Sequence, residues 1–477
     1  MVLGTTSGAG KSLLTTALCR HYARRGLRVA PFKPQNMSNN ARVVVGPGGQ
    51  PGEIGSAQYF QALAARAVPD VRMNPLLLKP ESDLRSQVVL LGQVDHGLGS
   101  MPWRDRSEVV WPTIATALDE LRAEYDVVVM EGAGSPAEVN LQATDVANIR
   151  PALHARARCL LVTDIDRGGA FAHLYGTWAL LPPPLRSMID GFVLNKFRGD
   201  PTLLDPAPRL LAHHTGVPTV ATLPMWREHG LPDEDGVFDD RSMAAGPITL
   251  TVAVVAYPRV SNLDEFQVLK TVPGLRLVWA RTPADVSAAD WIVLPGSKHT
   301  VADLGWIRDR GLDLAVIEHA RRGRAVLGIC AGLQMLGDRV QGSENGARGS
   351  VAGLGLLPVT TTYETAKIVR RTNTRLGALA GPWAALSGVE FEGYEIHQGR
   401  TQPTRDPGGT PTGPSGEGSW WQSGPVLGLS VHGLFEASST LRALFGASAT
   451  PLDAVFDGLA DFVTGHFDPG VLDRLVA

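Results

Sequence analysis

The sequence predicts an α/β fold with two doubly wound domains. Short apolar runs of β-branched residues and leucine, bounded by Gly, Pro or Asp, alternate with longer helical patterns. Such runs suit strands buried on both faces of a parallel sheet, and the helices between them suit right-handed crossovers. The alternation occurs in two series, separated by a polar stretch. We therefore expect two parallel sheets, each covered by helices.

Each series supplies several expected strands. Those of the first half are residues 28–32, 88–91, 126–130, 159–163 and 191–194. Those of the second half are residues 250–256, 275–280, 291–294 and 325–329. Helical patterns, such as residues 13–25 and 114–125, lie between strands of the first series. A parallel sheet requires crossover connections of this kind.

The polar stretch between the two series is the expected domain boundary. Residues 225–248 are rich in turn formers and weakly periodic, which is typical of a linker. We assign residues 1–240 to the first domain and residues 248–440 to the second. Residues 441–477 have helical patterning and are expected to form an extension that packs on the second domain. Residues 401–425 are expected to form a hairpin tip or a surface loop.

Composition limits the classes of function. The chain has 477 residues, 44% of them apolar, and a formal net charge of −3, which argues against binding to nucleic acid or to an anionic membrane. It has no apolar run long enough to span a bilayer and no signal peptide. Cys19, Cys159 and Cys330 are scattered, so neither a disulfide framework nor a zinc site is indicated, and a cytoplasmic location is expected. The sequence leaves the oligomeric state open, a homo-oligomer included.

The first motif is a glycine-rich turn at the N-terminus. The segment GTTSGAGKS, residues 4–12, lies between a strand of only three residues and the helix expected at 13–25. In this setting backbone N–H groups and the helix N-terminus point at phosphates. Lys11 is then placed to reach the outer phosphates of ATP, and the Ser12 hydroxyl to bind Mg²⁺. The expected ATP-binding residues are Thr5, Thr6, Ser7, Gly8, Gly10, Lys11, Ser12 and Asn195.

Later strands add to this nucleotide site. An apolar strand ends in Glu131 just before a glycine turn, and an acid in that place can hold Mg²⁺ directly or through water. Asn195 and Lys196 end another strand, where a purine base could be recognised. We expect Ser12, Glu131 and Glu53 as the metal-binding residues.

The glycine-rich turn departs from the general P-loop pattern at one place. Its first glycine stands one position early and is followed by Thr5. The segment resembles the dethiobiotin synthetase-like branch of P-loop proteins, which carries G-T-x-x-x-x-G-K-[ST] and uses ATP to activate a carboxyl-type group. Partitioning ATPases of the ParA/MinD type are relatives, but their signature lysine is missing from residues 5–7. The resemblance therefore implies a carboxyl-activating domain in preference to a molecular switch.

The second motif is a cysteine between two glycines. The apolar strand at 325–329 leads into Cys330, and a helical pattern follows Gly332. Gly328 and Gly332 permit the sharp turn of a nucleophile elbow, here with Cys in place of Ser. A helix N-terminus lowers the pKa of a thiol. Cys330 is therefore the expected nucleophile of this half of the chain.

A base and an oxyanion site accompany Cys330. His432 follows a short apolar stretch, and Gly296 follows the strand expected at 291–294. A histidine can shuttle a proton, and backbone N–H groups can stabilise an oxyanion. The combination resembles a class I, triad-type glutamine amidotransferase domain with a flavodoxin-like sheet. That resemblance implies Ala331 and Gly296 at the oxyanion and Gln334 near the glutamine.

One position departs from the triad pattern. Most class I members carry H-x-E, whereas His432 is followed by Gly433 and Leu434. Glu436 lies two residues further on and need not substitute. The cobalamin-pathway branch commonly lacks this carboxylate, so what orients the histidine stays open. His397 is a second histidine in this half, and we prefer His432 as the base because it follows the family order of Cys then His.

The two halves together describe one reaction. ATP would make a carboxyl phosphate, glutamine would supply ammonia, and an amide would form. Specific segments resemble the cobyric acid synthase family over nearly the whole chain: KPQNMSNN (33–40), EIGSAQ (53–58), MNPLLLKPESD (73–83), DIDRGGAFA (164–172), NKFRGD (195–200), LPDED (231–235) and GYEIHQGRT (393–401).

This resemblance implies ATP-, Mg²⁺- and glutamine-dependent amidation of a corrinoid. The implied substrate is adenosylcobyrinic acid a,c-diamide, amidated at its b, d, e and g carboxylates to give adenosylcobyric acid. The expected substrate-binding residues are Lys33, Asn36, Asn74, Lys79 and Arg167. Cobyrinic acid a,c-diamide synthase shares both domains but not this set of motifs, and is one alternative. A regulatory P-loop ATPase with an inactive glutaminase domain is another.

Overall fold

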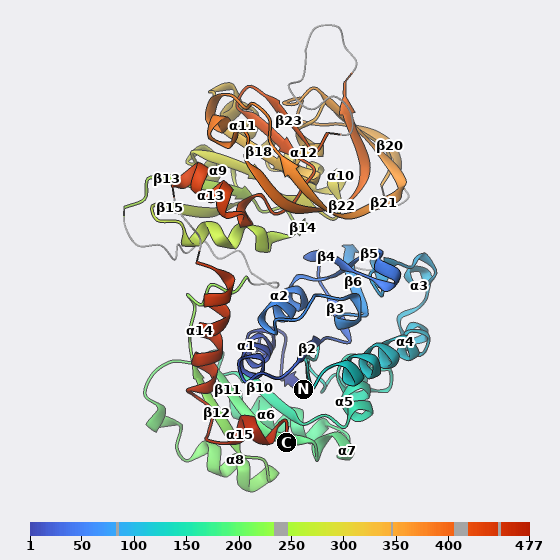
Figure 1. Cartoon of the computed structure of the whole chain (residues 1–477), viewed down its shortest axis with the longest axis vertical. Coiled ribbons are helices and arrows are strands. Elements are labelled where there is room, and N and C mark those ends of the chain that lie inside the picture. Colours follow the sequence, from blue (N-terminus) through green and yellow to red (C-terminus); the bar gives the residue numbers. More distant parts are fainter. Residues whose placement is uncertain (83–84, 233–246, 345–346, 405–417, 447–449) are drawn as a thin grey trace.

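The computed structural model describes residues 1–82, 85–232, 247–344, 347–404, 418–446 and 450–477. Residues 233–246 of the expected linker, including the end of the LPDED segment, and residues 405–417 of the expected loop lie outside this description. Two bodies are stacked along the long axis of the molecule (Figure 1). We name the lower one, which begins at the N-terminus, the N-terminal domain, and the upper one the C-terminal domain.

A parallel sheet forms the centre of the N-terminal domain. It runs in the order β1 (Val2–Gly4), β10 (Cys159–Asp164), β11 (Ile189–Phe197) and β12 (Thr219–Pro224). The parallel pair β2 (Val29–Phe32) and β9 (Val127–Met130) continues it, because a single parallel bridge joins Val2 to Glu131. Because these strands are parallel, the carboxyl ends of β1, β9 and β11 lie at the same edge of the sheet.

Helices cover both faces of this sheet. Neighbouring residues of a strand point to opposite faces. Accordingly Val2 belongs to the core under α1, whereas Leu3 belongs to the core with Leu174 of α6 on the other face. The helices are α1 (Lys11–Arg24), α2 (Ser56–Ala64), α3 (His96–Ser100), α4 (Trp103–Glu124), α5 (Ile149–Ala155), α6 (Ala170–Leu180), α7 (Pro183–Arg186) and α8 (Ala207–Thr215).

The strand expected at residues 88–91 does not join the parallel sheet. It lies in β7 (Arg85–Leu90), which pairs antiparallel with β6 (Leu76–Ser82) and β8 (Gln93–Val94). Only two residues separate β6 from β7, which suffices for a hairpin but not for a parallel crossover. β3 (Gln35–Met37) pairs parallel with β6, and β4 (Ala41–Val45) forms a separate hairpin with β5 (Pro51–Gly55).

A second parallel sheet forms the centre of the C-terminal domain. Its order is β15 (Leu275–Ala280), β13 (Leu250–Val255), β16 (Trp291–Leu294), β18 (Ala325–Ile329), β24 (Val426–Leu429) and β23 (Trp420–Ser423), with β23 antiparallel. All four strands expected in this half are present. The helices are α9 (Pro283–Ser287), α10 (Thr300–Asp309), α11 (Leu312–Arg321), α12 (Ala331–Leu336) and α13 (Ser438–Phe445). The α/β fold class with two wound parallel sheets is confirmed.

Two further sheets of the C-terminal domain were not predicted. β14 (Val260–Ser261) pairs with β17 (Gly296–Ser297). β20 (Ala347–Ala352), β19 (Arg339–Glu344), β21 (Val359–Arg375) and β22 (Glu390–Pro403) form a mostly antiparallel sheet. Its long strands carry many Thr, Arg and Glu residues, so they lack the continuous apolar runs by which we identified strands.

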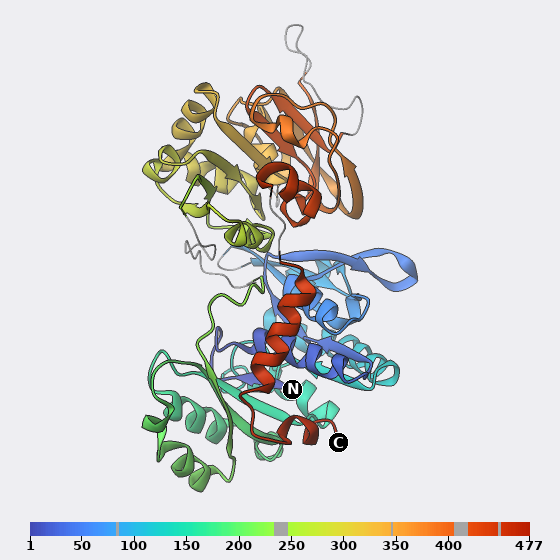
Figure 2. The same cartoon turned by 60° about the vertical axis from the view of Figure 1, so that its left-hand side comes forward.

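The expectation for the C-terminal extension was wrong. α14 (Leu452–Thr464) and α15 (Val471–Arg474) pack on the N-terminal domain, beside α1 (Figures 1 and 2). Phe456, Leu459 and Val463 belong to the core that contains Leu14 and Leu18. Apolar periodicity identifies the buried face of a helix but not the surface that covers it, and here the complementary surface belongs to α1.

Complementary charge at the contact between α1 and α14 favours the packing of α14 on the N-terminal domain. Arg20 is buried, and its Nε and Nη2 bind Asp457 at 2.7 Å and Asp453 at 3.0 Å. Arg24 binds Asp461 of α14 at 2.6 Å, and Arg25, which directly follows α1, pairs with Asp473 of α15. The basic face of one helix therefore meets the acidic face of the other.

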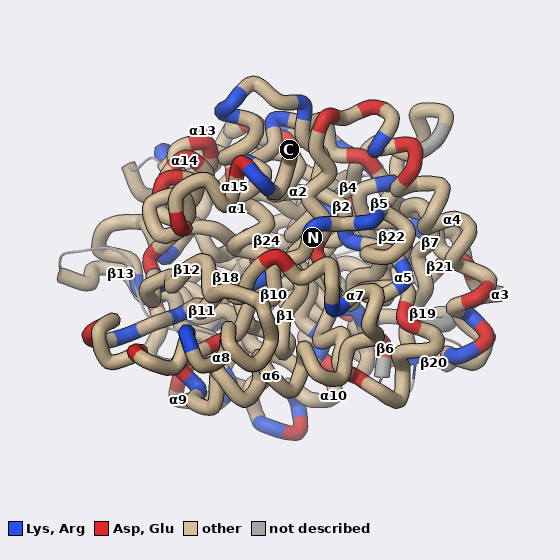
Figure 3. The backbone as a smooth tube through the Cα atoms, turned by 90° about the horizontal axis from the view of Figure 1, so that it is seen from below, with Lys and Arg blue, Asp and Glu red and all other residues tan. Residues whose placement is uncertain are grey.

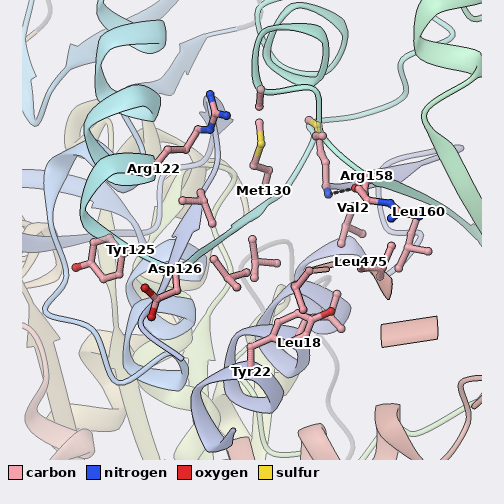
Figure 4. A pocket seen from close by; sticks show the side chains of 17 residues that line it. Val2, Leu18, Tyr22, Arg122, Tyr125, Asp126, Met130, Arg158, Leu160 and Leu475 are labelled. Atoms are coloured by element: carbon pink, nitrogen blue, oxygen red, sulfur yellow. Dashed lines mark hydrogen bonds between the residues drawn. The ribbon is translucent and has the colours of Figure 1, made fainter. Parts of the chain in front are cut away.

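A cavity of about 350 Å³ lies where β1 begins, lined by Val2, Leu18, Tyr22, Asp126 and Arg158 among others (Figure 4). Among the described residues, β9 pairs with β2, and a single bridge from Val2 to Glu131 joins it to β1. The cavity is at the opposite end of the strands from the glycine-rich turn, so it is not the expected nucleotide site.

The charged residues of the described chain are mixed in sign. Viewed from below, Lys and Arg positions alternate with Asp and Glu positions around the N-terminal domain (Figure 3). Among the described residues, no helix is both long enough and apolar enough to cross a membrane.

Candidate active site

The glycine-rich turn connects β1 to α1 and is fixed to the end of β11. Gly8 and Gly10 have positive φ angles of 60° and 96°, which glycine adopts without strain. A Cβ atom on Gly10 would lie 1.9 Å from Nδ2 of Asn195. That Nδ2 donates a hydrogen bond to the carbonyl of Ala9 at 2.9 Å. Asn195 therefore holds the turn in place from β11, which β10 separates from β1 in the sheet.

Lys11 folds back over the turn. Its Nζ donates to the carbonyls of Thr6 and Gly134, each at 3.0 Å. A Cβ atom on Gly4 would lie 2.9 Å from this Nζ, so the early glycine leaves room for the lysine. Thr5 donates its hydroxyl to Thr163 at 3.0 Å and is buried. The Thr5 side chain therefore ties the turn to β10, while Thr6, Ser7 and Gly8 are at least partly accessible.

Glu131 is the centre of a polar cluster beside the turn. Its Oε1 accepts hydrogen bonds from Ser12 Oγ at 2.8 Å and from Lys33 Nζ at 2.9 Å, and its Oε2 accepts one from Gln61 at 2.5 Å. Glu131 is 1% exposed. Burial raises the pKa of its carboxyl, but the Lys33 ammonium outweighs burial, and the net pKa is lowered. An ionised carboxylate and a hydroxyl thus stand side by side, and hard cations prefer such oxygen donors.

Arg167 and Lys196 border the other side of the turn. Lys196 Nζ donates to the carbonyl of Gly8 at 2.7 Å and to Asp164 at 3.0 Å. Arg167 lies 3.5 Å from the same Asp164 carboxylate, is 70% exposed and reaches over Gly8. The structure therefore brings Arg167 to the edge of the turn, as expected for a residue that meets a ligand.

The structure does not bring Glu53 to the Ser12–Glu131 cluster. Its Oε2 accepts from Lys79 at 2.8 Å, and its Oε1 pairs with Lys367 of the C-terminal domain. Burial raises the pKa of Glu53, but the two ammoniums lower it to about 2. A carboxylate already held by two cations is a poor metal ligand, so our assignment of Glu53 to the metal site is not supported by its position.

Two expected substrate-binding amides are occupied within the fold. Asn74 accepts from the N–H of Gly55 at 3.0 Å and donates to the carbonyls of Lys33 and Leu76, both at 3.1 Å. Asn36 donates to Gln58 at 3.0 Å. Both are buried. The contacts of Asn74 indicate a structural role, because they fix the segment that carries Lys33.

Cys330 has the geometry of a nucleophile elbow. It follows β18 directly, has a φ of 53°, and precedes α12. A Cβ atom on Gly332 would lie 1.9 Å from the carbonyl of Leu294, and one on Gly328 would lie 2.7 Å from the backbone of Gly332. Both glycines are therefore sterically required. A positive φ at a residue with a side chain is strained and is typical of functional sites.

His432 faces Cys330 because β24 lies next to β18 in the sheet. His432 follows β24 by three residues, and its charge contributes to the lowered pKa of the Cys330 thiol. Its Nδ1 lies 2.9 Å from Oε1 of Glu265, and Glu265 Oε2 accepts from the N–H of Gly433 at 3.0 Å. Glu265 is 0% exposed. This carboxylate stands where the missing glutamate of an H-x-E motif would act.

Sequence reasoning missed Glu265. It lies in the 3₁₀ segment Leu263–Thr271, 167 residues before His432. No spacing rule links two such distant positions. The only available signal was the pair of acids in SNLDEF, set within an otherwise apolar stretch.

The charges of this group favour a thiolate. Burial lowers the pKa of His432, but the Glu265 carboxylate and the Cys330 thiolate outweigh burial and raise it to about 10. Burial raises the pKa of Cys330, but the His432 imidazolium and the N–H of Ala331 contribute to a net lowering. Both shifts favour the thiolate–imidazolium pair, the reactive form of a cysteine nucleophile.

His397 also faces Cys330, but with a different carboxylate. Its Nδ1 lies 3.2 Å from the carbonyl of Gly399, and its Nε2 lies 3.7 Å from Oε1 of Glu395. Burial lowers its pKa, but Glu395 outweighs burial, and the net pKa is raised. Since Glu265 lies 2.9 Å from Nδ1 of His432, closer than Glu395 lies to His397, the geometry favours His432 as the base.

A pocket at Cys330 is lined by residues of both domains. Gln334 accepts from Thr300 Oγ1 at 3.1 Å and from Tyr363 at 3.0 Å, and it lines this pocket with Ala331. A Cβ atom on Gly296 would lie 2.9 Å from Cε1 of His432, so the Gly296 backbone borders the same site. The remaining lining residues include Asn39 and Lys79 of the N-terminal domain and Ser297, Lys298, Lys367 and Gln398 of the C-terminal domain.

Comparison with known proteins places each half in a family. Residues 1–229 match the CobQ/CobB/MinD/ParA nucleotide binding domain, and residues 251–440 match the CobB/CobQ-like glutamine amidotransferase domain. Over its whole length the chain is 67% identical to a cobyric acid synthase of Variovorax paradoxus, of which 99% is covered.

The chain belongs to the cobyric acid synthase family. Members from Acidovorax ebreus and Polaromonas naphthalenivorans are 65% and 63% identical over 100% of this chain and 98% and 99% of theirs. As a cobyric acid synthase family member with both domains, it is a glutamine-hydrolysing amidotransferase ligase that uses ATP. The expectations for family, enzyme class and the use of ATP and glutamine are confirmed.

Proposed function

We propose that this chain amidates a corrinoid, adenosylcobyrinic acid a,c-diamide, at its b, d, e and g carboxylates. The relatives named cobyric acid synthase support the substrate class. One observation supports the coupling of glutamine hydrolysis to carboxylate activation. Asn39 and Lys79 of the ATP-binding domain line the pocket at Cys330. Ammonia formed there is released against the domain that activates the carboxylate.

In the glutaminase half, Cys330 is the proposed nucleophile. Its thiolate attacks the amide carbon of glutamine, and the N–H groups of Gly296 and Ala331 stabilise the oxyanion. His432 donates a proton to the leaving ammonia, and a thioester forms. Water then attacks the thioester while His432 accepts a proton, which releases glutamate and restores the thiolate and the imidazolium. Glu265 fixes the orientation of His432 throughout.

In the ATP-binding half, a corrinoid carboxylate attacks the γ-phosphate. ADP leaves, and a carboxyl phosphate is formed. Ammonia displaces phosphate from this mixed anhydride to give the amide. The glycine-rich turn with Lys11 is the proposed phosphate site, because its backbone and ammonium offer positive charge where negative charge develops. Arg167, at the exposed edge of the turn, is a proposed contact to phosphate or substrate.

We propose Mg²⁺ as the cation of this site. Ser12 and Glu131 fit it, because a hydroxyl and an ionised carboxylate lie 2.8 Å apart beside the turn. Bound there, the cation would neutralise charge on the ATP phosphates. Lys33 holds Glu131 ionised and is a proposed neighbour of the carboxylate that receives phosphate.

Mass spectrometry tests the substrate and the number of steps. The chain is incubated with adenosylcobyrinic acid a,c-diamide, ATP, Mg²⁺ and glutamine. Each conversion of a carboxyl group to an amide lowers the mass by about 1 Da. Four successive steps support the proposal, and an unchanged corrinoid contradicts it. Amidation of cobyrinic acid at only two carboxylates would assign the chain to the a,c-diamide synthase reaction instead.

A further inference from the structure

One arginine of the N-terminal domain is buried among residues of the C-terminal domain. Arg42 on β4 is 3% exposed. Its guanidinium donates to Glu436 at 2.8 and 2.6 Å and, through Nε, to Asp264 at 3.1 Å. A guanidinium has a rigid fork of donors that matches carboxylates closely. Arg42 therefore fixes two carboxylates of the other domain at once.

The same guanidinium lies over the ring that supports His432. Its carbon is 4.9 Å from the ring centroid of Tyr394. Tyr394 stacks on His432 with centroids 5.3 Å apart and ring planes inclined by 16°. The backbones of Tyr394 and His432 also exchange hydrogen bonds of 2.9 and 3.3 Å. Arg42, Tyr394 and His432 thus form a continuous stack that crosses from one domain into the other.

Residues beside Arg42 fasten the segment that carries Glu265. Asn262 Nδ2 donates to the carbonyl of Ala41 at 2.8 Å and to Tyr394 Oη at 2.6 Å. The N–H of Leu263 donates to Oδ1 of Asn40 at 3.1 Å. Asp264, the other partner of Arg42, directly precedes Glu265. The N-terminal domain therefore holds the segment from which Glu265 reaches His432.

Charge makes this arrangement sensitive to Arg42. Asp264 is fully buried, and burial raises the pKa of its carboxyl while Arg42 opposes that rise. Removing one partner of a buried ion pair leaves an uncompensated charge, which is strongly unfavourable. Asp264 would then bind a proton or turn toward water. Either change moves the residue adjacent to Glu265.

We propose that Arg42 is a positioning residue that holds His432 in its reactive orientation from the neighbouring domain, so that glutamine hydrolysis requires docked domains. Arg42 contacts neither the thiol nor the ATP site; it acts through Tyr394 and through Asp264. The inference rests on the proposed roles of Cys330 and His432.

The first test compares two nitrogen sources in Arg42→Ala. With glutamine, kcat is expected to fall about tenfold or more, while KM for glutamine changes little, because the orientation of the base is lost rather than the glutamine pocket. With saturating ammonium and ATP, amidation should stay within about twofold of wild type, since no glutaminase step is needed. Arg42→Lys keeps a positive charge but lacks the forked guanidinium. Its glutamine-dependent kcat should lie between those of wild type and Arg42→Ala.

The second test follows the Cys330 thiolate itself. The rate of alkylation by iodoacetamide is measured against pH, with Cys330→Ser as the blank for Cys19 and Cys159. The charged or titratable groups around the thiol and imidazole include His432, His397, Glu265 and Tyr257 and, through Tyr394, Arg42. Lys79, Lys298 and Lys367 line the same pocket. If His432 is displaced, the midpoint of alkylation moves to higher pH in Arg42→Ala, because less imidazolium faces the thiolate.

Arg20→Ala is the matched control. Arg20 is also buried and also binds two carboxylates, those of Asp453 and Asp457, but at α14 in the N-terminal domain. The Arg20→Ala variant should leave the pH midpoint of Cys330 alkylation unchanged.

Two results overturn the inference. One is a wild-type glutamine-dependent kcat and alkylation midpoint in both Arg42 variants. The other is an equal loss of amidation activity with glutamine and with ammonium in both Arg42 variants. That result would mean that Arg42 contributes only to the stability of the fold. If wild-type protein releases no glutamate, or Cys330→Ser releases as much, the proposed function fails independently of Arg42.

Discussion

Oε1 of Glu265 lies 2.9 Å from Nδ1 of His432, although 167 residues separate them in the chain. The contact adds a buried carboxylate to the pair formed by Cys330 and His432. It also shows that a carboxylate from a different part of the fold can occupy the place left vacant by Leu434 after His432. The orientation of the base therefore depends on tertiary structure instead of a local motif.

Replacing Glu265 by Gln should weaken the contact with His432 without changing its shape. The carboxylate raises the pKa of His432, so its removal lowers that pKa and withdraws the imidazolium that stabilises the Cys330 thiolate. We expect glutamine-dependent kcat to fall about a hundredfold at neutral pH. The midpoint of Cys330 alkylation should move to higher pH. An unchanged midpoint would show that Glu265 does not set the charge of His432.

Cys330→Ser should separate the two nitrogen sources. Serine at the elbow has no thiolate, so glutamine-dependent amidation should be lost, whereas amidation from high ammonium should continue. Glutamate release and corrinoid mass are the two measurements. Retention of glutamine use would remove Cys330 from the role of nucleophile.

Lys11→Ala should stop amidation from either nitrogen source. Its ammonium lies over the glycine-rich turn, held at the carbonyls of Thr6 and Gly134. Without it, transfer of the γ-phosphate loses electrostatic stabilisation. Glutamate release, which takes place at the Cys330 site in the other domain, should persist. ATP-dependent amidation at the wild-type rate in this variant would contradict the assignment of the phosphate site.

Gly296→Ala should disable the glutaminase site by sterics alone. Its Cβ would lie 2.6 Å from Ser261 Oγ and 2.9 Å from Cε1 of His432. The imidazole must give way, so glutamine-dependent kcat should drop while ammonium-dependent amidation stays. Gly305, whose Cβ meets no atom within 4 Å, is the matched control, and Gly305→Ala should keep both activities.

Arg20→Ala should loosen the C-terminal helix α14. Arg20 is buried while its partners are partly exposed, so the carboxylates can regain water and the cost is chiefly that of the lost charge-assisted hydrogen bonds. We expect the free energy of unfolding to fall by about 1.5–3 kcal/mol in urea titrations. Arg209→Ala, which breaks the exposed pair with Asp205, should leave the urea midpoint in place. A similar shift in both variants would show that burial of Arg20 is unimportant.

Local sequence patterns predicted most of the fold and the two reactive motifs. Buried parallel strands are continuous apolar runs, so all but one of the expected strands joined the two central sheets. The glycine-rich turn and the elbow are each contiguous in sequence, so the sequence records them directly. The contacts that require Gly10 and Gly332 are with Asn195 and Leu294, which lie far away in the chain.

Long-range pairings could not be predicted in this way. Glu265, Arg42 and Glu53 all find their partners across the fold, and their charge gives no indication of which partner it will be. Glu53 was assigned to a metal because acids suit cations, but its position puts it between Lys79 and Lys367. The partner of α14 was missed for the same reason, since both domains offer apolar surface.

The return of α14 to α1 has a consequence for how the molecule is made. Phe456, Leu459 and Val463 complete the core around Leu14 and Leu18. The core of the N-terminal domain therefore cannot be completed until α14 has been synthesised, after the whole glutaminase domain. Until then one face of α1 stays uncovered, and a chain stopped before α14 would expose that surface permanently.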